Sequence, residues 1–333
     1  MKKNHLLIIG SNSFSGSSFA NFALNKNLNV IGISRSVQPR PFFLKYNNNE
    51  NIKRFKFFKV DINKNLDQVV NIISKYRPSF ILNFAAQGMV EESWNNPTDW
   101  YITNFLSTVK IIEEIKKFKF IKKFINFTTP EVYGSTDRWI KENFSFNPST
   151  PYALSRAAID FHLNLTYKTF NFPVIFTRTA NVYGPHQQLY RIIPKAIIYF
   201  LKKKELKLHG GGKSYRSFIH IDDVSRALYM ILKKGKLGDT YHISTNKLIS
   251  IKKLVNMIGY KITKNLSYKK KIKSVSDRVG KDKYYKLNSF KLRSKIGWKP
   301  IINLNYGIDT VVEWLKKNKL EIERSNLNYL HKK

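Results

Sequence analysis

Residues 5–16 read HLLIIGSNSFSG, a short apolar run followed by a turn with glycines at positions 10 and 16. The turn has the spacing GxxGxxG, with Ser13 in the place of the middle glycine. A strand, a tight turn and a helix in this order direct backbone N–H groups and a helix N-terminus at a pyrophosphate. We therefore expect a dinucleotide site, although an ordinary turn between a strand and a helix would look similar. The predicted cofactor contacts are Gly10, Asn12, Ser13, Phe14, Ser15 and Gly16.

The first half of the chain repeats this unit, because short apolar runs alternate with amphipathic stretches. Strands are predicted over residues 5–9, 30–34, 55–60, 80–84, 124–128 and 174–179. Helices are predicted over residues 16–24, 66–75, 104–117 and 152–170. This alternation predicts an α/β fold, a Rossmann-like, doubly wound parallel sheet with helices on both faces.

The alternation weakens after about residue 180, where turns rich in glycine and proline follow. We expect residues 1–178 and about 219–247 to form the dinucleotide-binding domain. Residues 179–218 and 248–320 would form a smaller C-terminal lobe that binds the substrate. Residues 321–333 are expected to form a peripheral tail.

The second predicted strand ends in Ser34 and Arg35, where an NAD-selective site usually has a carboxylate for the ribose 2′-hydroxyl. A guanidinium beside hydroxyl groups suits a 2′-phosphate, so the sequence slightly favours NADP over NAD. If Arg35 is instead a solvated loop residue, either cofactor would fit. Further cofactor contacts are expected at the ends of the next two strands, from Asp61, Ile62, Phe84, Ala85 and Ala86.

Polar residues also follow the fifth predicted strand, where residues 128–134 read TTPEVYG. Tyr152 and Arg156 stand at positions i and i+4 of a predicted helix, so both side chains share a face. A cation beside a phenol lowers the phenol pKa, which would let Tyr152 act as a general base. Tyr152 and Arg156 are also predicted to contact the cofactor. Thr129 can hydrogen-bond the same substrate alcohol, and Glu131 can exchange a proton with a neighbouring carbon. These four residues are the predicted catalytic group.

Several further motifs follow one another in a fixed order along the chain. They are the turn at 10–16, NFAA at 83–86, Asn104, TTPEVYG, Tyr152, TANVYGP at 179–185, RSFIHIDDVSRAL at 216–228 and DRVGKD at 277–282. With this order and spacing, residues 5–315 resemble the extended short-chain dehydrogenase/reductase family, and within it the nucleotide-sugar 4,6-dehydratases and epimerases.

The resemblance implies a nucleotide-diphospho-hexose 4,6-dehydratase. In such enzymes a bound nicotinamide accepts a hydride from C4 of the hexose while the tyrosine takes the hydroxyl proton. Water is eliminated across C5 and C6, the hydride returns to C6, and a 4-keto-6-deoxy sugar nucleotide is formed. Glu131 favours this reaction. The alternatives are a 4-epimerase, another NDP-sugar oxidoreductase, and a non-catalytic binding protein with the same fold.

Two positions depart from the family pattern. The residue four positions after the tyrosine is usually Lys, but Arg156 stands here, and a planar guanidinium replaces a compact ammonium. dTDP-glucose dehydratases usually have Thr-Asp-Glu where this chain has Thr129-Pro130-Glu131. The site thus resembles GDP-mannose dehydratases, which have Thr-Ser-Glu and use NADP, and Glu131 would serve both proton transfers. The nucleotide-side motifs are closer to the dTDP-glucose branch, so neither sugar nor base is assigned.

The expected partner is a nucleotide-diphospho-sugar, whose diphosphate suits arginines in motif positions. For any single arginine, a surface ion pair is the alternative. The predicted substrate-binding residues are Gln87, Asn181, Arg191, Arg216 and Arg278, with Lys281 and Asp282 as weaker candidates.

The composition limits the remaining possibilities. The chain has 333 residues, no cysteine and a formal net charge of +37. Lysines are spread along the whole chain, so we attribute the charge to a compositional bias and expect no nucleic-acid partner. No apolar run is long enough for a membrane span, and the histidines lack metal-ligand spacing. We expect no metal and a cytoplasmic location. The family resemblance implies a homodimer that pairs through residues 104–117 and 152–170.

Overall fold

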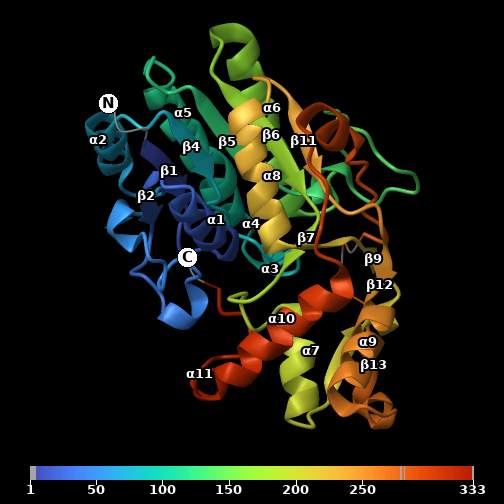
Figure 1. Ribbon diagram of the computed structural model, residues 1–333. Coiled ribbons are helices and arrows are strands. Elements are labelled where there is room, and N and C mark those ends of the chain that lie inside the picture. Colours follow the sequence, from blue (N-terminus) through green and yellow to red (C-terminus); the bar gives the residue numbers. More distant parts are fainter. Residues whose placement is uncertain (1–4, 278–279, 281, 332–333) are drawn as a thin grey trace.

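The computed structural model describes residues 5–277, 280 and 282–331, and its centre is a seven-stranded parallel sheet (Figure 1). The strand order is β11-β6-β5-β4-β1-β2-β3. The strands are β1 (His5–Ile9), β2 (Asn29–Ser34), β3 (Phe55–Lys59), β4 (Phe80–Asn83), β5 (Lys123–Thr128), β6 (Val174–Thr179) and β11 (Thr240–Ile243). All six predicted strands are present, and the Rossmann-like fold is confirmed. The order reverses between β1 and β4, which is where open α/β sheets bind ligands.

Helices cover both faces of this sheet, because a parallel sheet buries both of its faces. Along β1, Leu6 and Ile8 pack toward α1 (Phe14–Asn25) and α8 (Ile221–Lys234). Leu7 and Ile9 point the other way, toward α2 (Leu66–Tyr76), α5 (Ser107–Ile115) and α6 (Pro151–Phe170). This alternation follows from the two-residue period of a strand.

Two of the predicted helices differ from the expectation at their N-terminal ends. Helix α1 begins at Phe14 rather than at residue 16, because the Ser13 side chain accepts the N–H of Gly16 and caps the helix. The helix predicted over 104–117 consists of two parts. A π-helix, η3 (Ile102–Leu106), comes first and continues directly into α5. A π-helical turn is rare and often occurs at a functional site. Two short helices precede it, α3 (Glu92–Asn95) and α4 (Pro97–Tyr101).

The smaller lobe has its own hydrophobic core between α7 (Ile192–Leu201), α9 (Ile251–Thr263) and α10 (Leu304–Lys317). Three two-stranded sheets accompany these helices. They pair β7 (Asn181–Tyr183) with β10 (Phe218–His220), β8 (Leu206–His209) with β13 (Ile272–Val275), and β9 (Tyr215–Arg216) with β12 (Ile249–Ser250). A short helix, α11 (Lys319–Glu323), follows α10 at the foot of the lobe (Figure 1). Between the two halves of the lobe, α8 and β11 return to the large sheet.

Short helical turns connect these elements. They are η1 (Pro41–Phe43), η2 (Ile52–Arg54), η4 (Pro130–Tyr133), η5 (Gly210–Gly212), η6 (Ser267–Lys271) and η7 (Leu292–Ile296). Within the described part of the chain, no helix combines the length and apolar character that crossing a membrane requires.

Candidate active site

The glycine turn lies at the reversal of strand order, between β1 and α1. Gly10 has φ +86°, and a Cβ there would lie 2.7 Å from the backbone nitrogen of Ala85. Only glycine allows this conformation together with so close an approach between the two strand ends. Ser13 Oγ donates to the carbonyl of Gly10 at 2.7 Å and accepts the N–H of Gly16 at 3.0 Å. The predicted turn therefore places the N-terminus of α1 at the edge of the sheet where a pyrophosphate would bind.

Asn12 connects this turn to the end of β2. Its backbone N–H donates to Ser34 Oγ at 2.9 Å, and its side-chain amide donates to the carbonyls of Ser36 and Val37. The Asn12 Oδ1 atom is buried and accepts no hydrogen bond from the described residues. A dinucleotide fits here, because its hydroxyl groups could donate to this atom. The Ser34 hydroxyl faces Asn12, so the predicted preference for NADP depends on Arg35, which is half-buried.

The ends of β3 and β4 carry the remaining predicted cofactor contacts. Asp61 Oδ1 accepts the N–H of Asn63 at 2.9 Å, and Ile62 is buried. Phe84 is buried beside the ring of Phe127, with the ring centroids 4.8 Å apart. The N–H of Ala85 donates to Asn83 Oδ1, whereas Ala86 is exposed. These residues follow the carboxyl ends of β3 and β4, on the same edge of the sheet as the glycine turn.

Thr129 and Glu131 lie directly after β5, where the chain turns into η4. Thr129 Oγ1 donates to Glu131 Oε2 at 2.7 Å and also accepts the Glu131 backbone N–H. Pro130 occupies the first position of η4, where its missing N–H has no partner to lose. Burial raises the pKa of the Glu131 carboxyl, and the hydrogen bond from Thr129 and the charges of Arg216 and Arg191 oppose this rise.

Tyr152 is the second residue of α6, and its side chain lies close to Thr129. Burial and the nearby charge of Glu131 raise the pKa of Tyr152 to about 12, although Arg156 and Arg191 act in the opposite direction. Arg156 lowers the pKa of Tyr152, as expected from the sequence, but burial and the charge of Glu131 raise it by more. The sequence reveals the cation at i+4, but it does not reveal the carboxylate beside the phenol or the burial of both.

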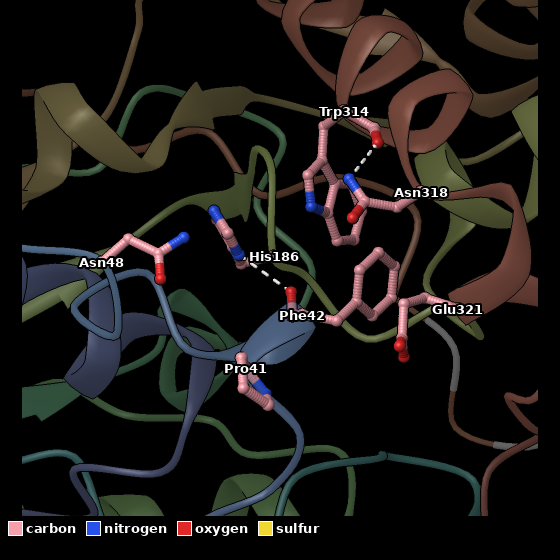
Figure 2. Close-up of a pocket in the computed structure, with 7 residues that line it drawn as sticks. All are labelled: Pro41, Phe42, Asn48, His186, Trp314, Asn318 and Glu321. Atoms are coloured by element: carbon pink, nitrogen blue, oxygen red, sulfur yellow. Dashed lines mark hydrogen bonds between the residues drawn. The ribbon is translucent and has the colours of Figure 1, made fainter.

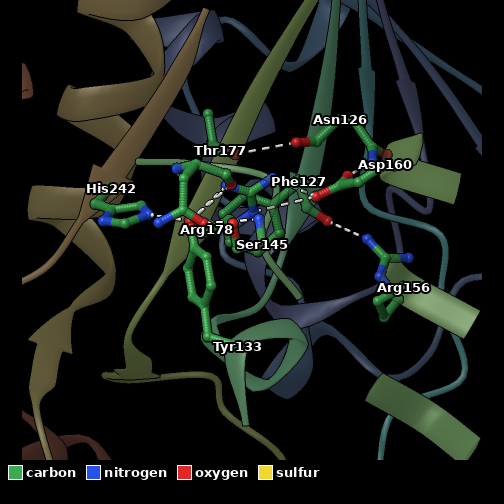
Figure 3. Close-up of polar contacts among 10 residues, drawn as sticks. Asn126, Phe127, Tyr133, Ser145, Arg156, Asp160, Thr177, Arg178 and His242 are labelled. Atoms are coloured by element: carbon green, nitrogen blue, oxygen red, sulfur yellow. Dashed lines mark hydrogen bonds and ion pairs between the residues drawn. The ribbon is translucent and has the colours of Figure 1, made fainter. Parts of the chain in front are cut away.

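Arg156 is almost fully buried, with 2% of its surface exposed. Its Nη2 donates to the carbonyl oxygen of Phe127, the penultimate residue of β5, and Figure 3 shows the side chain directed at this carbonyl. The Arg156 Nε is also buried, and no described residue accepts its hydrogen. A cofactor hydroxyl could accept this N–H, so the residue fits its predicted place beside the cofactor.

Sequence reasoning missed a polar network behind Arg156 (Figure 3). Asp160 and Arg178 are fully buried and form an ion pair, with Arg178 Nη2 3.1 Å from Asp160 Oδ2. Arg178 Nη1 donates to the hydroxyl of Tyr133 at 2.6 Å, and Asn126 Nδ2 donates to Asp160 Oδ1 at 2.9 Å. The network joins TTPEVYG to β5, β6 and α6. An arginine inside the apolar strand VIFTRT is the signal that could have found it.

Asn104, in the π-helix η3, holds the loop after β4. Its Oδ1 accepts the Gln87 backbone N–H at 2.7 Å, and its Nδ2 donates to the Gln87 carbonyl and to Ser155 Oγ. Gln87, a predicted substrate contact, is thereby fixed beside α6. Asn104 belongs to the series of sequence motifs, but the sequence does not predict that it positions Gln87.

The predicted substrate residues differ in their surroundings. Arg191, at the start of α7, is exposed and lies near enough to Glu131 and Tyr152 for its charge to lower the pKa of both. Asn181 is exposed on β7. Arg278 and the weaker candidate Lys281 lie outside the described residues.

Arg216 is buried, in contrast to Arg191. Its guanidinium donates to the carbonyls of Tyr215, Asp282 and Lys283 and lies over the Tyr285 ring. Much of its hydrogen-bonding capacity thus serves the fold of the lobe. Asp282, the other weak candidate, accepts hydrogen bonds from Ser149 and Tyr285.

The sequence profile described as GDP-mannose 4,6 dehydratase matches residues 7–311, which is most of the chain. The chain belongs to the GDP-mannose 4,6-dehydratase family. This confirms the predicted resemblance and the prediction that the chain is an enzyme.

Curated proteins and solved structures of this group match nearly the whole chain. A dTDP-glucose 4,6-dehydratase from Haemophilus influenzae is 28% identical over 337 residues, covering 93% of this chain and 97% of the relative. The dTDP-glucose 4,6-dehydratase from Bacillus anthracis, solved in complex with NAD, has a TM-score of 0.82 at 28% identity and covers 95% of this chain and 97% of its own. A UDP-glucuronic acid 4-epimerase from Bacillus cereus, in complex with UDP-glucuronic acid and NAD, has a TM-score of 0.83 at 26% identity, with 94% and 99% covered. The architecture of the GDP-mannose 4,6-dehydratase family therefore extends to epimerases.

Proposed function

We propose that the chain is a nucleotide-diphospho-hexose 4,6-dehydratase that forms an NDP-4-keto-6-deoxyhexose. The hydrogen bond between Thr129 and Glu131 carries this proposal, because it places a carboxyl group with a raised pKa beside Tyr152. A 4-epimerase needs the tyrosine and the threonine for chemistry at C4, but it needs no base beside C5. Glu131 supplies that base, and elimination requires it.

Tyr152 and Thr129 would act at C4 of the hexose. In its phenolate form, Tyr152 accepts the proton of the C4 hydroxyl as that carbon is oxidised. Thr129 hydrogen-bonds Glu131 and lies close to Tyr152, so it can orient the C4 oxygen between the two groups that exchange protons. The resulting 4-ketone makes the C5 hydrogen acidic.

Glu131 would perform both proton transfers of the elimination. Its carboxylate accepts the C5 proton as the C5–H bond breaks, and the neutral acid then returns a proton to the C6 hydroxyl. The C6–O bond breaks and water leaves. A raised pKa suits this double role, because a carboxyl group whose pKa is closer to the working pH can both accept and donate a proton. Pro130 has no proton to donate. In this scheme Glu131 therefore acts first as the base and then as the acid.

We propose a nicotinamide dinucleotide as the resident cofactor, held by the glycine turn, Asn12, Arg35 and Arg156. When bound, it accepts the hydride from C4 and later supplies it to C6. The NAD complexes of the relatives support NAD as strongly as Arg35 supports NADP. For the nucleotide-sugar we propose Arg191, Gln87 and Asn181 as contacts, with Arg278 as a further candidate and Arg216 acting on Glu131 through its charge.

The test is incubation of the purified protein with a panel of dTDP-glucose, GDP-mannose, UDP-glucose and UDP-glucuronic acid, with added NAD or NADP. The expected result is a product that has lost one water from one member of the panel, detected by mass spectrometry. An unchanged mass with an inverted C4 centre would identify an epimerase and contradict the proposal. No turnover of any member, with cofactor bound, would favour a binding protein.

We also propose a homodimer. Leu154, Phe161 and Leu165 lie on one face of α6 and are 48%, 44% and 61% exposed. Ile102 and Leu106 of the neighbouring η3 are 36% and 46% exposed. An apolar surface of this kind on two adjacent helices suits a second copy of the same surface, as in an isologous dimer.

A further inference from the structure

Residues 325–331 follow α11 and run from the lobe to the part of the molecule that contains the large sheet. In Figure 1 the C-terminal end of the chain lies away from α11 and beside that part. We call this segment the strap. Its contacts link it to the loop after β2, to the residues at the start of α7 and to α4. The second of these places contains Arg191, which we propose as a contact of the sugar nucleotide.

The strap begins where the lobe meets the loop after β2. Arg40 Nη2 donates to Ser325 Oγ at 2.6 Å, and Arg40 Nη1 pairs with Glu321 Oε2 at 2.8 Å. Glu321 also lines a cavity of about 310 Å³, where the rings of Phe42 and Trp314 stack with 4.4 Å between their centroids (Figure 2). The root of the strap is therefore held by groups from both parts of the molecule.

The far end of the strap is held by α4. His331 Nε2 donates to Asp99 Oδ2 at 2.7 Å, because a carboxylate oxygen can only accept. The His331 ring also stacks on Trp100, with 5.0 Å between the centroids. Trp100 is fully buried and donates from Nε1 to the carbonyl of Gly88 at 3.1 Å. The end of the strap thus supports the segment after β4 that also contains Gln87.

Tyr329 lies between these two attachments and packs on Tyr190. The two rings meet edge to face, with 5.3 Å between their centroids. The Arg191 guanidinium lies over the same Tyr190 ring, 5.4 Å from its centroid. The Tyr329 hydroxyl lies 3.3 Å from His331 Nδ1, so its hydrogen bond is made within the strap. The ring of Tyr329, rather than its hydroxyl, is therefore what supports Arg191.

Arg191 and Gly88 connect the two ends of this arrangement. A Cβ atom at Gly88 would lie 3.4 Å from Arg191 Nη2, so the guanidinium lies directly beside the backbone that Trp100 holds. The contacts form a closed circuit that passes through Tyr329, Tyr190, Arg191, Gly88, Trp100 and His331. Arg191 is exposed, and these contacts restrict a side chain that would otherwise move freely in solvent.

We propose that the strap positions the Arg191 guanidinium for the diphosphate of the sugar nucleotide. Tyr329 acts through Tyr190, and His331 acts through Trp100. The proposal rests on the proposed function, from which the role of Arg191 comes. A long side chain loses much of its rotamer freedom when it binds an anion. Contacts that restrict the side chain beforehand reduce this cost, so the strap tightens binding without touching the ligand.

Binding of nucleoside diphosphates to the full chain tests this proposal without turnover. The probes are dTDP, GDP and UDP, and affinity is measured by calorimetry. Tyr329→Leu removes the ring, Tyr329→Phe keeps it, and His331→Ala removes the stack on Trp100. Each variant is made alone and together with Arg191→Gln, and all are compared at a temperature at which circular dichroism shows them folded. Leu330→Ala is the matched control, because Leu330 is on the strap but 63% exposed.

We expect Arg191→Gln to weaken binding of the diphosphate about ten-fold or more, because it removes a charge-assisted hydrogen bond. Tyr329→Leu and His331→Ala should each weaken it about three- to ten-fold, the range for one aromatic contact. Together with Arg191→Gln, the same two substitutions should change the affinity less than about two-fold, because their effect passes through Arg191. Tyr329→Phe and Leu330→Ala should bind like the wild type. Binding of NADH should be unchanged throughout.

Equal losses in the presence and absence of Arg191 would show that the strap acts on the fold in general and would overturn the proposal. Unchanged diphosphate binding in both Tyr329→Leu and His331→Ala would also overturn it, as would a wild-type chain that binds none of the three probes. Failure of the dehydratase reaction, with diphosphate binding and its dependence on the strap intact, would contradict the proposed function and leave this proposal standing.

Discussion

Tyr152 and Arg156 stand one turn apart on α6, yet Arg156 donates its hydrogen bond to the carbonyl of Phe127 and reaches Tyr152 through its charge. Glu131 acts on the same phenol with the opposite sign. The protonation of Tyr152 therefore depends on two neighbours that oppose each other, and each can be removed separately.

The first prediction concerns the pKa of Tyr152, which burial and Glu131 raise to about 12. Glu131→Gln removes a negative charge and should lower this pKa, whereas Arg156→Met removes a positive charge and should raise it. Arg156→Lys keeps the charge and serves as the control. The measurement is a titration of tyrosinate absorbance, taken as the difference from Tyr152→Phe because the chain has 18 tyrosines. Shifts of the same sign in the two variants would contradict the opposing roles.

Elimination should be lost in Glu131→Gln, while cofactor binding is retained. Removing a general acid–base typically costs about 10²- to 10⁴-fold in rate, and here one group would serve two transfers. The rate of water loss is followed by product mass, and proton exchange at C5 is followed in deuterated water. Glu313→Gln, at an exposed position of α10, is the control. A normal rate of product formation in Glu131→Gln would remove Glu131 from the mechanism.

The same substitution should stabilise the fold. The folded-state pKa of Glu131 lies above the ordinary value of 4.5, so the ionised group destabilises the folded protein. Its contribution to stability is fully present below 4.5 and is lost as the pH rises through the folded-state pKa. Glu131→Gln should thus need a higher urea concentration to unfold near neutral pH, with a gain in unfolding free energy of about 1 kcal/mol, which is typical of single stabilising substitutions. The gain should vanish when urea unfolding is repeated below the ordinary pKa.

Arg156→Lys should retain part of the activity. The lysine ammonium supplies the positive charge that acts on Tyr152. It lacks the planar guanidinium, in which Nη2 donates to the Phe127 carbonyl and Nε keeps a second N–H for another acceptor. We expect kcat to fall about ten-fold, in line with the loss of one positioned hydrogen bond of about 1 kcal/mol. Steady-state kinetics and calorimetric cofactor affinity measure the effect. Wild-type values for both would show that charge alone is required.

Asp160→Asn should destabilise the fold severely. It leaves Arg178 and Arg156 buried beside an uncharged amide, and breaking a buried pair costs about 3–5 kcal/mol. Urea unfolding of the single and double variants with Arg178→Met gives the coupling energy. The surface pair of Lys116 and Glu113, tested by Glu113→Gln, should contribute no more than about 1 kcal/mol. A similar small cost for Asp160→Asn would contradict the role assigned to the network.

Leu165→Asp should produce a monomer. A charge at this position would be buried in the proposed interface, where an unpaired carboxylate is strongly unfavourable. Light scattering after size-exclusion chromatography measures the mass of the species in solution. Leu266→Asp, at a site in the lobe that is 57% exposed, should leave the mass unchanged. Equal masses for the two variants and the wild type would show that this face of α6 is not the interface.

The sequence predicts the large sheet well because its signals are local. Apolar runs, the glycine turn and the helix periodicity each arise within a few residues, and six strands were located from them. The sequence does not predict β11, because this strand is short and lies after residue 180, where the alternation is weak. Its parallel pairing with β6 shows that it belongs to the large sheet.

The site is predictable in its members but not in its electrostatics. Thr129, Glu131 and Tyr152 were identified from motif positions, and the structure brings them together. Their pKa values depend on burial and on charges from distant segments, such as Arg191 on α7, which no local pattern encodes. For the same reason, the contact of His331 with Asp99 could not be expected, because it joins residues 232 positions apart.

Pro130 has a consequence for conformational entropy. The ring fixes φ at this residue, so the unfolded turn samples fewer conformations and loses less freedom when Thr129 caps η4. Glu131 follows immediately and is held in place before any ligand arrives, which reduces the ordering cost of binding. An aspartic acid at position 130 would add a second acid but would also loosen the turn that carries the first. This chain has the rigid turn and a single carboxylate.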